Sequence, residues 1–409
     1  MNRSGYSDLP LHGGKVPAWL YQRMSRLGLA IVEVIIAEYG QAEFLSRISD
    51  PFWFQSFGAV LGMDWHSSGI TTSVLGALKS SVNRRSDDLG IYFCGGRGLQ
   101  SRATPAELLH IADKTGLDGA ELVRASKLSA KIDNTAVQDG FQLYLHSFIL
   151  SQTGEWCVLQ QGMNTQSHLA RRYHWHSPRV KSFVSNPHAS IVGQSVGPIL
   201  NLVDIKAAGS RQGVLNIVQE SPARMISEIP YLRMPDHHEV QVKDVDLKRL
   251  GAMLYQAHEA DPADFESLLL LKGMGPRTLQ SLALVSEVIY GTPTRFSDPA
   301  RFSFAHGGKD GHPFPVPTKI YDETIAFLND AVVKAKLDRS DKIQAGKTLF
   351  ELGKAKEGQF SPDPERFDQY LRHEREMSKH YGGRTVHDNA KTKRADRMGS
   401  AQNNQLELF

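Results

Sequence analysis

The sequence predicts an α/β N-terminal lobe, in which a small sheet packs with helices, followed by an all-α lobe and a disordered C-terminal tail. The sheet is indicated by two apolar runs, Phe141–Leu150 and Trp156–Gln160, which flank a Gly-containing turn and are typical of a β-hairpin. The second lobe is indicated by apolar residues at helical spacing over Phe265–Ala283. After about Ser361 the chain is polar and charged, a composition that favours disorder. The predicted segments are 1–185 for the N-terminal domain, 186–241 for a connector, 242–360 for the helical domain and 361–409 for the tail.

The N-terminal lobe is expected to begin with helices. A helical pattern opens at Pro17 and runs to about Ile48 with a break at Gly40, and Asp50-Pro51 ends it. The run at 141–150 is mostly apolar without clean alternation, which predicts a strand buried on both faces. Further expected elements are an aromatic core segment at Phe52–Phe57, a helix over Ile70–Ser81, a strand over Ile91–Cys94, a helix from a capping box at Thr104–Glu107 to about Thr115, and helices again from about Gln166.

The composition excludes several classes of protein. The 409 residues suffice for two or three domains, and a formal net charge of +3 does not by itself indicate a nucleic-acid binder. Two cysteines, Cys94 and Cys157, are too few for a disulfide framework or a cysteine-rich zinc site. The apolar run nearest the N-terminus, Leu27–Ala37, is interrupted by Glu33 and does not resemble a signal peptide. No run reaches the roughly 18 apolar residues of a membrane span. We therefore expect a cytoplasmic, nucleoid-associated protein without a signal peptide or a membrane partner.

The predicted helical lobe contains a turn suited to a phosphate. Residues 265–271 and 276–283 read as two apolar helices joined by a Gly-Met-Gly turn. Glycine permits positive φ and a close approach of a phosphate, and the second helix begins at Pro276, where its N–H groups suit an anion. The pattern resembles the helix-hairpin-helix element with which DNA repair proteins hold a DNA backbone; the alternative is an ordinary helical hairpin with a glycine C-cap. The expected DNA-binding residues of this element are Lys272, Gly273, Met274, Gly275, Arg277 and Thr278.

Longer phrases of the sequence carry a second resemblance. They are Leu11–Pro17, Gly62–Thr72, Ala136–Gly140, Gln160–Asn164, Ala170–Trp175 and Phe302–Val316. In this order they resemble a prokaryotic family catalogued as domain of unknown function 763, over about residues 5–375. The resemblance implies an N-terminal nuclease domain joined to a helix-hairpin-helix domain. The tail after about residue 380 lies outside it.

Polar residues gather in the predicted loops of the N-terminal lobe. Nuclease chemistry needs carboxylates or histidines that hold Mg²⁺ or Mn²⁺ against a phosphodiester. The candidate catalytic residues are Asp64, His66, Asp133, Asp139 and His174, with Asp64, Asp133 and Asp139 as metal ligands if they converge in space. The common restriction-enzyme-like core has an acid and a lysine where this chain has Gln160 and Gln161. The alternative assigns the aspartates to turns and caps, and makes His66 a partly buried histidine whose hydrogen bonds are satisfied within the protein.

Three arginines extend the predicted DNA contact. Arg97 lies in a glycine-rich loop after a strand, which suits a phosphate but lacks the Gly-Lys-Ser/Thr ending of a P-loop. Arg171 and Arg172 lie in a run, expected on a helix, that interleaves cations with aromatics and suits backbone contact plus base stacking; the alternative is a helix with an aromatic core face. Asp298 follows the hairpin at the range where glycosylases built on this element carry a catalytic aspartate, although its context is more simply that of an N-cap.

The last five residues form an abrupt apolar patch at the end of the polar tail. Gln405, Leu406, Leu408 and Phe409 resemble the pentapeptide by which bacterial polymerases and repair proteins dock on the sliding clamp. Taken together, the patterns predict a bacterial DNA-processing protein of repair or replication, a metal-dependent endonuclease tethered to the clamp. The alternatives are a non-catalytic adaptor that binds DNA structures and a glycosylase-like base remover.

Overall fold

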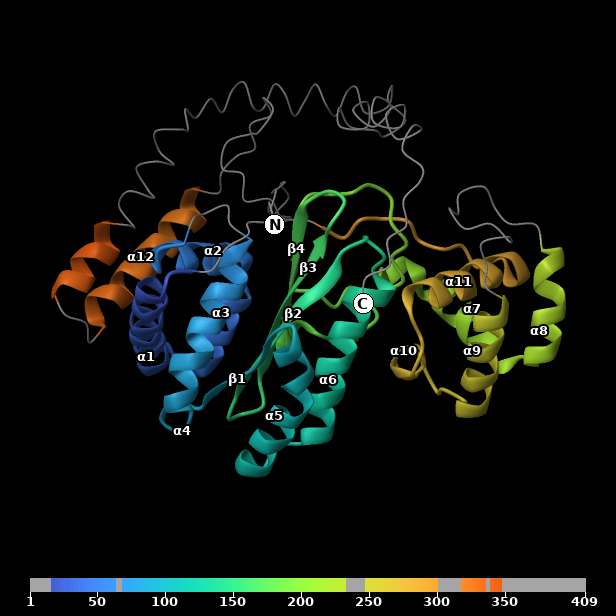
Figure 1. The fold of residues 1–409 in the computed structure, drawn as a ribbon, viewed down its shortest axis with the longest axis horizontal. Helices are drawn as coiled ribbons and strands as arrows, with labels where there is room; N and C mark the ends of the chain where they lie inside the picture. Colours follow the sequence, from blue (N-terminus) through green and yellow to red (C-terminus); the bar gives the residue numbers. More distant parts are fainter. Residues whose placement is uncertain (1–15, 64–67, 233–246, 301–317, 336–338, 348–409) are drawn as a thin grey trace, which may run out of the picture. The chain divides into compact units, whose positions relative to one another are not determined.

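A five-stranded antiparallel sheet forms the centre of the computed structural model, which describes residues 16–63, 68–232, 247–300, 318–335 and 339–347 (Figure 1). Each strand pairs with the next one in the chain, so the sheet is a meander in the order β1 to β5. The strands are β1 Ile91–Arg97, β2 Gln142–Ser151, β3 Trp156–Asn164, β4 Leu169–His176 and β5 Ser190–Val192.

One face of the sheet is covered by N-terminal helices. Alternate strand residues such as Phe93, Ile149 and Leu159 pack there against an apolar cluster of α1, α2 and α3. Asp50 sets the start of α2, because its side chain accepts hydrogen bonds from the first free N–H groups of that helix. The elements of this side are α1 Ala18–Ser49, α2 Pro51–Val60, α3 Gly69–Val82, η1 Asn83–Arg85, α4 Ser86–Leu89 and α12 Thr318–Lys334.

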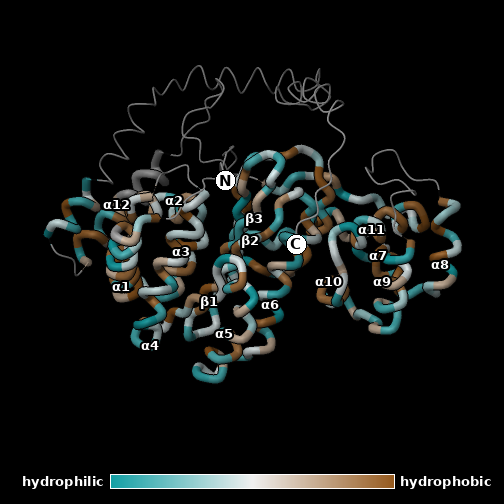
Figure 2. The backbone as a smooth tube through the Cα atoms, viewed as in Figure 1, coloured by the Kyte–Doolittle hydropathy of each residue, from teal (hydrophilic) through white to brown (hydrophobic). Residues whose placement is uncertain are grey.

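The other face packs against the helices between β1 and β2, and helices later in the chain join the same apolar core by packing against these. A single apolar cluster contains Phe148 and Trp175 of the sheet together with Val214, Leu254 and Leu282 of the later helices. Hydrophobic (brown) and hydrophilic (teal) residues alternate along the helices of this side (Figure 2). The elements here are α5 Leu99–Thr115, α6 Gly119–Lys131, the π-helical turn η2 Ile132–Ala136, η3 Ser177–Arg179, η4 Ile205–Ala207, α7 Ala208–Gln219, α8 Pro222–Glu228, η5 Ile229–Tyr231, α9 Leu247–Ala260, α10 Phe265–Leu270 and α11 Pro276–Tyr290.

Several local predictions are confirmed. Gly40 breaks the first helix with φ 87°, the predicted helix at 70–81 is α3, and the hairpin is β2–β3. The coarse prediction of a mixed α/β chain with a small sheet also holds. Within the described ranges, no helix is both long and apolar enough to cross a bilayer.

Two predicted elements are wrong, and a third segment contains more secondary structure than expected. Residues 169–176 form strand β4 and not a helix, because both faces of the strand are buried and its arginines obscure the expected alternation. Helix α5 begins at Leu99, so the predicted capping box lies inside the helix. Pro105 has no N–H for the Ser101 carbonyl, and the hydroxyl of Thr104 donates to that carbonyl at 2.7 Å in its place. The segment expected as a connector contains β5, α7 and α8.

Candidate functional site

The sheet divides the polar residues of strand β4 between its two faces. Successive side chains of a strand point to opposite faces. Arg171 and Tyr173 face α6 and η2, where both contact Asp139. Arg172 and His174 face the N-terminal helices, and His174 Nδ1 donates to the Ser49 carbonyl at 2.9 Å. The sheet therefore separates His174 from Asp139, although the sequence placed both in one catalytic set.

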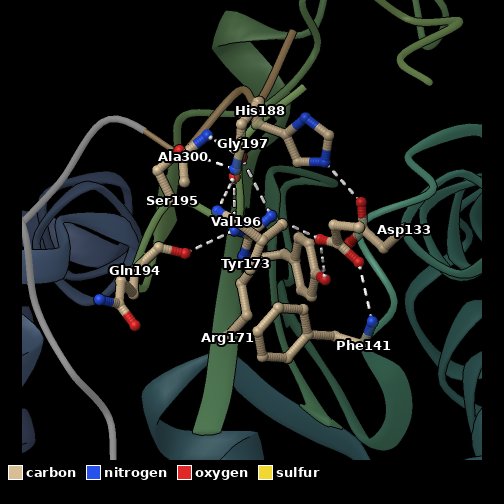
Figure 3. Close-up of polar contacts among 12 residues, drawn as sticks. Asp133, Phe141, Arg171, Tyr173, His188, Gln194, Ser195, Val196, Gly197 and Ala300 are labelled. Carbon is tan, nitrogen blue, oxygen red and sulfur yellow. Dashed lines mark hydrogen bonds and ion pairs between the residues drawn. The ribbon is translucent and has the colours of Figure 1, made fainter. Parts of the chain in front are cut away.

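Asp133 lies in the π-helical turn η2 and is fully buried. One carboxylate oxygen accepts from Gln160 Nε2 at 2.5 Å and from Trp175 Nε1 at 2.9 Å. The other oxygen is 2.5 Å from Nε2 of His188 (Figure 3). Burial raises the pKa of Asp133, and His188 and Trp175 oppose that rise. Protein donors therefore occupy both oxygens of a residue expected to hold a metal.

A relay of hydrogen bonds continues from this carboxylate along the same face of the sheet to α6. Gln160 Oε1 lies 2.9 Å from His146 Nδ1, and His146 Nε2 lies 2.8 Å from the Ser126 hydroxyl. Burial lowers the pKa of His146, so the ring is neutral at pH 7. An amide oxygen can only accept, so His146 donates through Nδ1 and Ser126 donates to Nε2. Gln160 joins the two halves of the network, a role that its sequence position did not reveal.

Arg171 lies between two carboxylates. Its Nη1 donates to Asp139 at 2.8 Å, its Nη2 donates to Asp298 at 2.8 Å and to the Gln194 carbonyl at 2.7 Å, and its guanidinium lies 4.7 Å from the ring centre of Phe141 (Figure 3). Burial alone would lower the pKa of Arg171, but the two aspartates outweigh it and raise that pKa. Arg171 is fully buried, so in this structure it offers no surface to DNA.

Asp298 is positioned by the same ion pair. Its carboxylate also accepts the backbone N–H groups of Val196 and Ala300, at 2.8 and 2.9 Å. The first bond fixes the loop that follows β5, and the second fixes the chain after Asp298 itself. These contacts explain the presence of Asp298 without any chemistry on a base.

Arg172 occupies the opposite face, where it contacts polar groups of α2, α3 and β4. It donates to His174 Nε2 at 2.8 Å, to the Thr71 hydroxyl at 3.2 Å and to Gln55 Oε1 at 2.9 Å, and its guanidinium lies 4.8 Å from the ring centre of Phe54. Burial lowers the pKa of Arg172 to about 9. Burial, followed by the charge of Arg172, lowers the pKa of His174 well below its usual value, so His174 is neutral.

Gln161 extends this second cluster toward α3. Its amide nitrogen donates to the Ser68 carbonyl at 3.1 Å and to the Tyr144 hydroxyl at 2.8 Å, while its buried Oε1 has no hydrogen-bond partner among the described residues. Asp64 and His66, two of the predicted catalytic residues, lie outside the described residues immediately before Ser68. Across the described residues, no three histidine, cysteine or carboxylate side chains are grouped so as to hold a metal ion.

The helical hairpin consists of α10, a turn and α11. Gly273 takes φ 88°, Gly275 is the N-cap of α11, and Pro276 is the first helical residue. Met274 is 1% exposed and plugs the turn into the core, as expected. Lys272 and Arg277 are exposed on either side, whereas Thr278 is buried. Within the part of the chain that the structure describes, no side-chain hydrogen bond caps the N-terminus of α11.

Side chains from other elements hold the backbone of this hairpin. Lys131 Nζ, at the end of α6, donates to the Met274 carbonyl at 2.5 Å, and Gln138 Nε2 donates to the Pro276 carbonyl at 2.8 Å. The guanidinium of Arg249 is also close, since a Cβ added to Gly275 would lie 3.7 Å from its Nη2. The sequence did not point to these residues, because they lie far from the hairpin along the chain.

Arg97 lies apart from both buried networks. It is exposed at the end of β1, with its guanidinium 5.9 Å from the ring centre of Tyr144. The four residues predicted to bind a sliding clamp, Gln405, Leu406, Leu408 and Phe409, lie outside the described residues.

Comparison with known proteins identifies the family of the chain. Residues 5–316 match the family described as protein of unknown function, DUF763, and the chain belongs to that family. No curated protein and no solved structure was found to match it.

Proposed function

We propose that the protein binds the DNA backbone through the α10–α11 hairpin and acts in DNA repair or replication. The observation that supports this most is the exposed turn at Gly273 beside the uncapped N-terminus of α11, flanked by exposed Lys272 and Arg277. Free N–H groups and the positive end of the helix dipole attract a phosphate, and glycine lets it come close to the backbone.

The electrostatics of the hairpin agree with this proposal. Neither Lys272 nor Arg277 forms an ion pair within the described chain, so both charges are available to an anion. The buried Met274 and the bonds from Lys131 and Gln138 fix the turn before any ligand binds. A fixed site binds with a smaller loss of conformational entropy.

Charge reversal tests the proposal. Lys272→Glu/Arg277→Glu should weaken binding to duplexes of any sequence alike, because phosphate contacts carry no base code. The slope of log affinity against log salt should become shallower by about 0.9 for each lost phosphate contact. Lys272→Arg/Arg277→Lys keeps the charge and should retain most of the affinity. Wild-type protein that binds no DNA at low salt would refute the proposal.

Metal-dependent cleavage in the N-terminal half is our second proposal. It is supported by the polar cluster of Arg172, Thr71 and Gln161, which reaches Ser68 at the start of α3, a few residues after Asp64 and His66 in the sequence. Asp64→Ala should abolish cleavage under Mg²⁺ or Mn²⁺ and leave DNA affinity unchanged. Asp133 and Asp139 are held by protein donors, so their alanine variants should lose stability along with any activity. Absence of cleavage on single-stranded, nicked, branched and duplex DNA would favour the non-catalytic adaptor.

Docking on the bacterial sliding clamp through Gln405–Phe409 is also proposed. In such motifs the glutamine bonds at the rim of a pocket and the apolar residues fill its floor, and a long tail raises the effective concentration of the protein near DNA. Leu408→Ala/Phe409→Ala should abolish binding to the purified clamp and leave hairpin-dependent DNA binding unchanged. Intact protein that does not bind the clamp would end this proposal.

A further inference from the structure

The topology brings a second set of cations to the end of the molecule where the hairpin is held. Strand β1 ends at Arg97, which pairs with Leu145 near the start of β2. Helix α5 starts directly after this strand end, and the neighbouring antiparallel helix α6 returns to the same end, where it finishes at Lys131. Lys131 donates to the Met274 carbonyl of the hairpin. The start of α5, the end of α6 and the hairpin therefore share one end of the sheet.

The order of these elements across that end is also defined. Helix α6 packs against α5 on one side and against α10 on the other, and η2, which continues α6, packs against α11 (Figure 1). Cations on α6 therefore lie between those at the start of α5 and those on the hairpin. A single ligand that crosses the end of α6 reaches both.

The exposed charges of residues 95–106 and 126–145, which lie at this end, are all positive. Arg97, Arg102 and Lys127 are exposed. Lys131 is half-buried and donates one hydrogen bond to the hairpin. Residues 95–106 contain no acid, and the only acids in 126–145 are Asp133 and Asp139, which are buried. The next acid along α5, Glu107, is bonded to Lys79 and to the Gly95 N–H. An anionic ligand therefore meets no exposed carboxylate within these two segments.

We propose that this end face, defined by Arg97, Arg102, Lys127 and Lys131, is a second DNA-backbone contact continuous with the hairpin, so that one duplex spans both. The proposal rests on the proposed DNA binding and adds a footprint longer than the hairpin alone provides. Phosphates can contact these cations without meeting an exposed acid of either segment, and long flexible side chains make such contacts without base selectivity.

The test compares duplex lengths and a matched charge change. Arg97→Glu/Arg102→Glu removes two cations from the end face. Arg84→Glu/Lys114→Glu makes the same change in net charge at the opposite end of the sheet, because Arg84 precedes β1 and Lys114 lies in the last turn of α5. Affinity is measured against salt for duplexes of about 10 and about 25 base pairs. Circular dichroism and thermal unfolding check that each variant is folded.

We expect the end-face variant to bind the longer duplex at least tenfold more weakly than the wild type. The slope of log affinity against log salt for that duplex should become shallower by about two. Its binding to the shorter duplex, which the hairpin alone can hold, should change little more than that of the control. An end-face variant that matches the control on both duplexes would overturn this inference while leaving the hairpin proposal intact. Wild-type protein that binds neither duplex would refute both.

Discussion

The clearest structural prediction concerns Arg171, which was expected from the sequence to contact DNA. Arg171 is completely buried between Asp139 and Asp298, whose side chains are 1% and 4% exposed. Arg171→Met keeps most of the side-chain volume but leaves two carboxylates buried without their counter-charge. Removing one partner of a buried ion pair costs about 3–5 kcal/mol, and we expect a loss of folding stability of that size.

The loss should depend on pH in a defined direction. Burial raises the pKa of Asp139, and removing the arginine raises it further. An acid whose pKa is higher in the folded state destabilises the fold as pH rises through the interval between the unfolded and folded pKa values. The deficit of Arg171→Met should therefore shrink as pH is lowered from about 7 to about 5. Adding Asp139→Asn and Asp298→Asn removes both charges and should restore part of the stability at pH 7.

The assay is urea and thermal unfolding of the full chain, followed by far-UV circular dichroism. Arg85 supplies the control, because it also contacts two carboxylates, Glu33 and Asp88, but is about half exposed. Water screens such a pair, so Arg85→Met should change the midpoint only slightly. If Arg171→Met unfolds at the same midpoint as Arg85→Met, or loses DNA affinity while keeping wild-type stability, the assignment of Arg171 to an internal ion pair is wrong.

Two further predictions test other parts of the fold by the same measurements. Burial lowers the pKa of His146, so the unfolded chain takes up a proton at a higher pH than the folded chain, and folding stability should fall as pH drops below about 6.5. His146→Gln should reduce this pH dependence, and an unchanged pH profile would contradict the buried relay. Gly95→Ala should destabilise the protein more than Gly98→Ala, because both residues have positive φ but only at Gly95 would the new Cβ meet a backbone oxygen, that of His146, at 2.3 Å; equal midpoints for the two variants would refute this packing.

The sequence by itself determined the elements whose signals are local. The turn at Gly273, the start of α11 at Pro276 and the burial of Met274 follow from conformational preferences within a few residues, and the structure shows all three. The β2–β3 hairpin follows in the same way from two apolar runs around a turn.

Only the tertiary structure decided which polar residues share an environment. Arg171 and Arg172 are adjacent in sequence, yet a strand sends their side chains to opposite faces, and a strand buried on both faces gives no alternation to predict this. Asp133 meets Gln160, Trp175 and His188 because three separate segments fold onto η2. Lys131 reaches the hairpin across 143 residues of chain. Contacts of this kind depend on the packing of elements distant in sequence, so no local pattern records them.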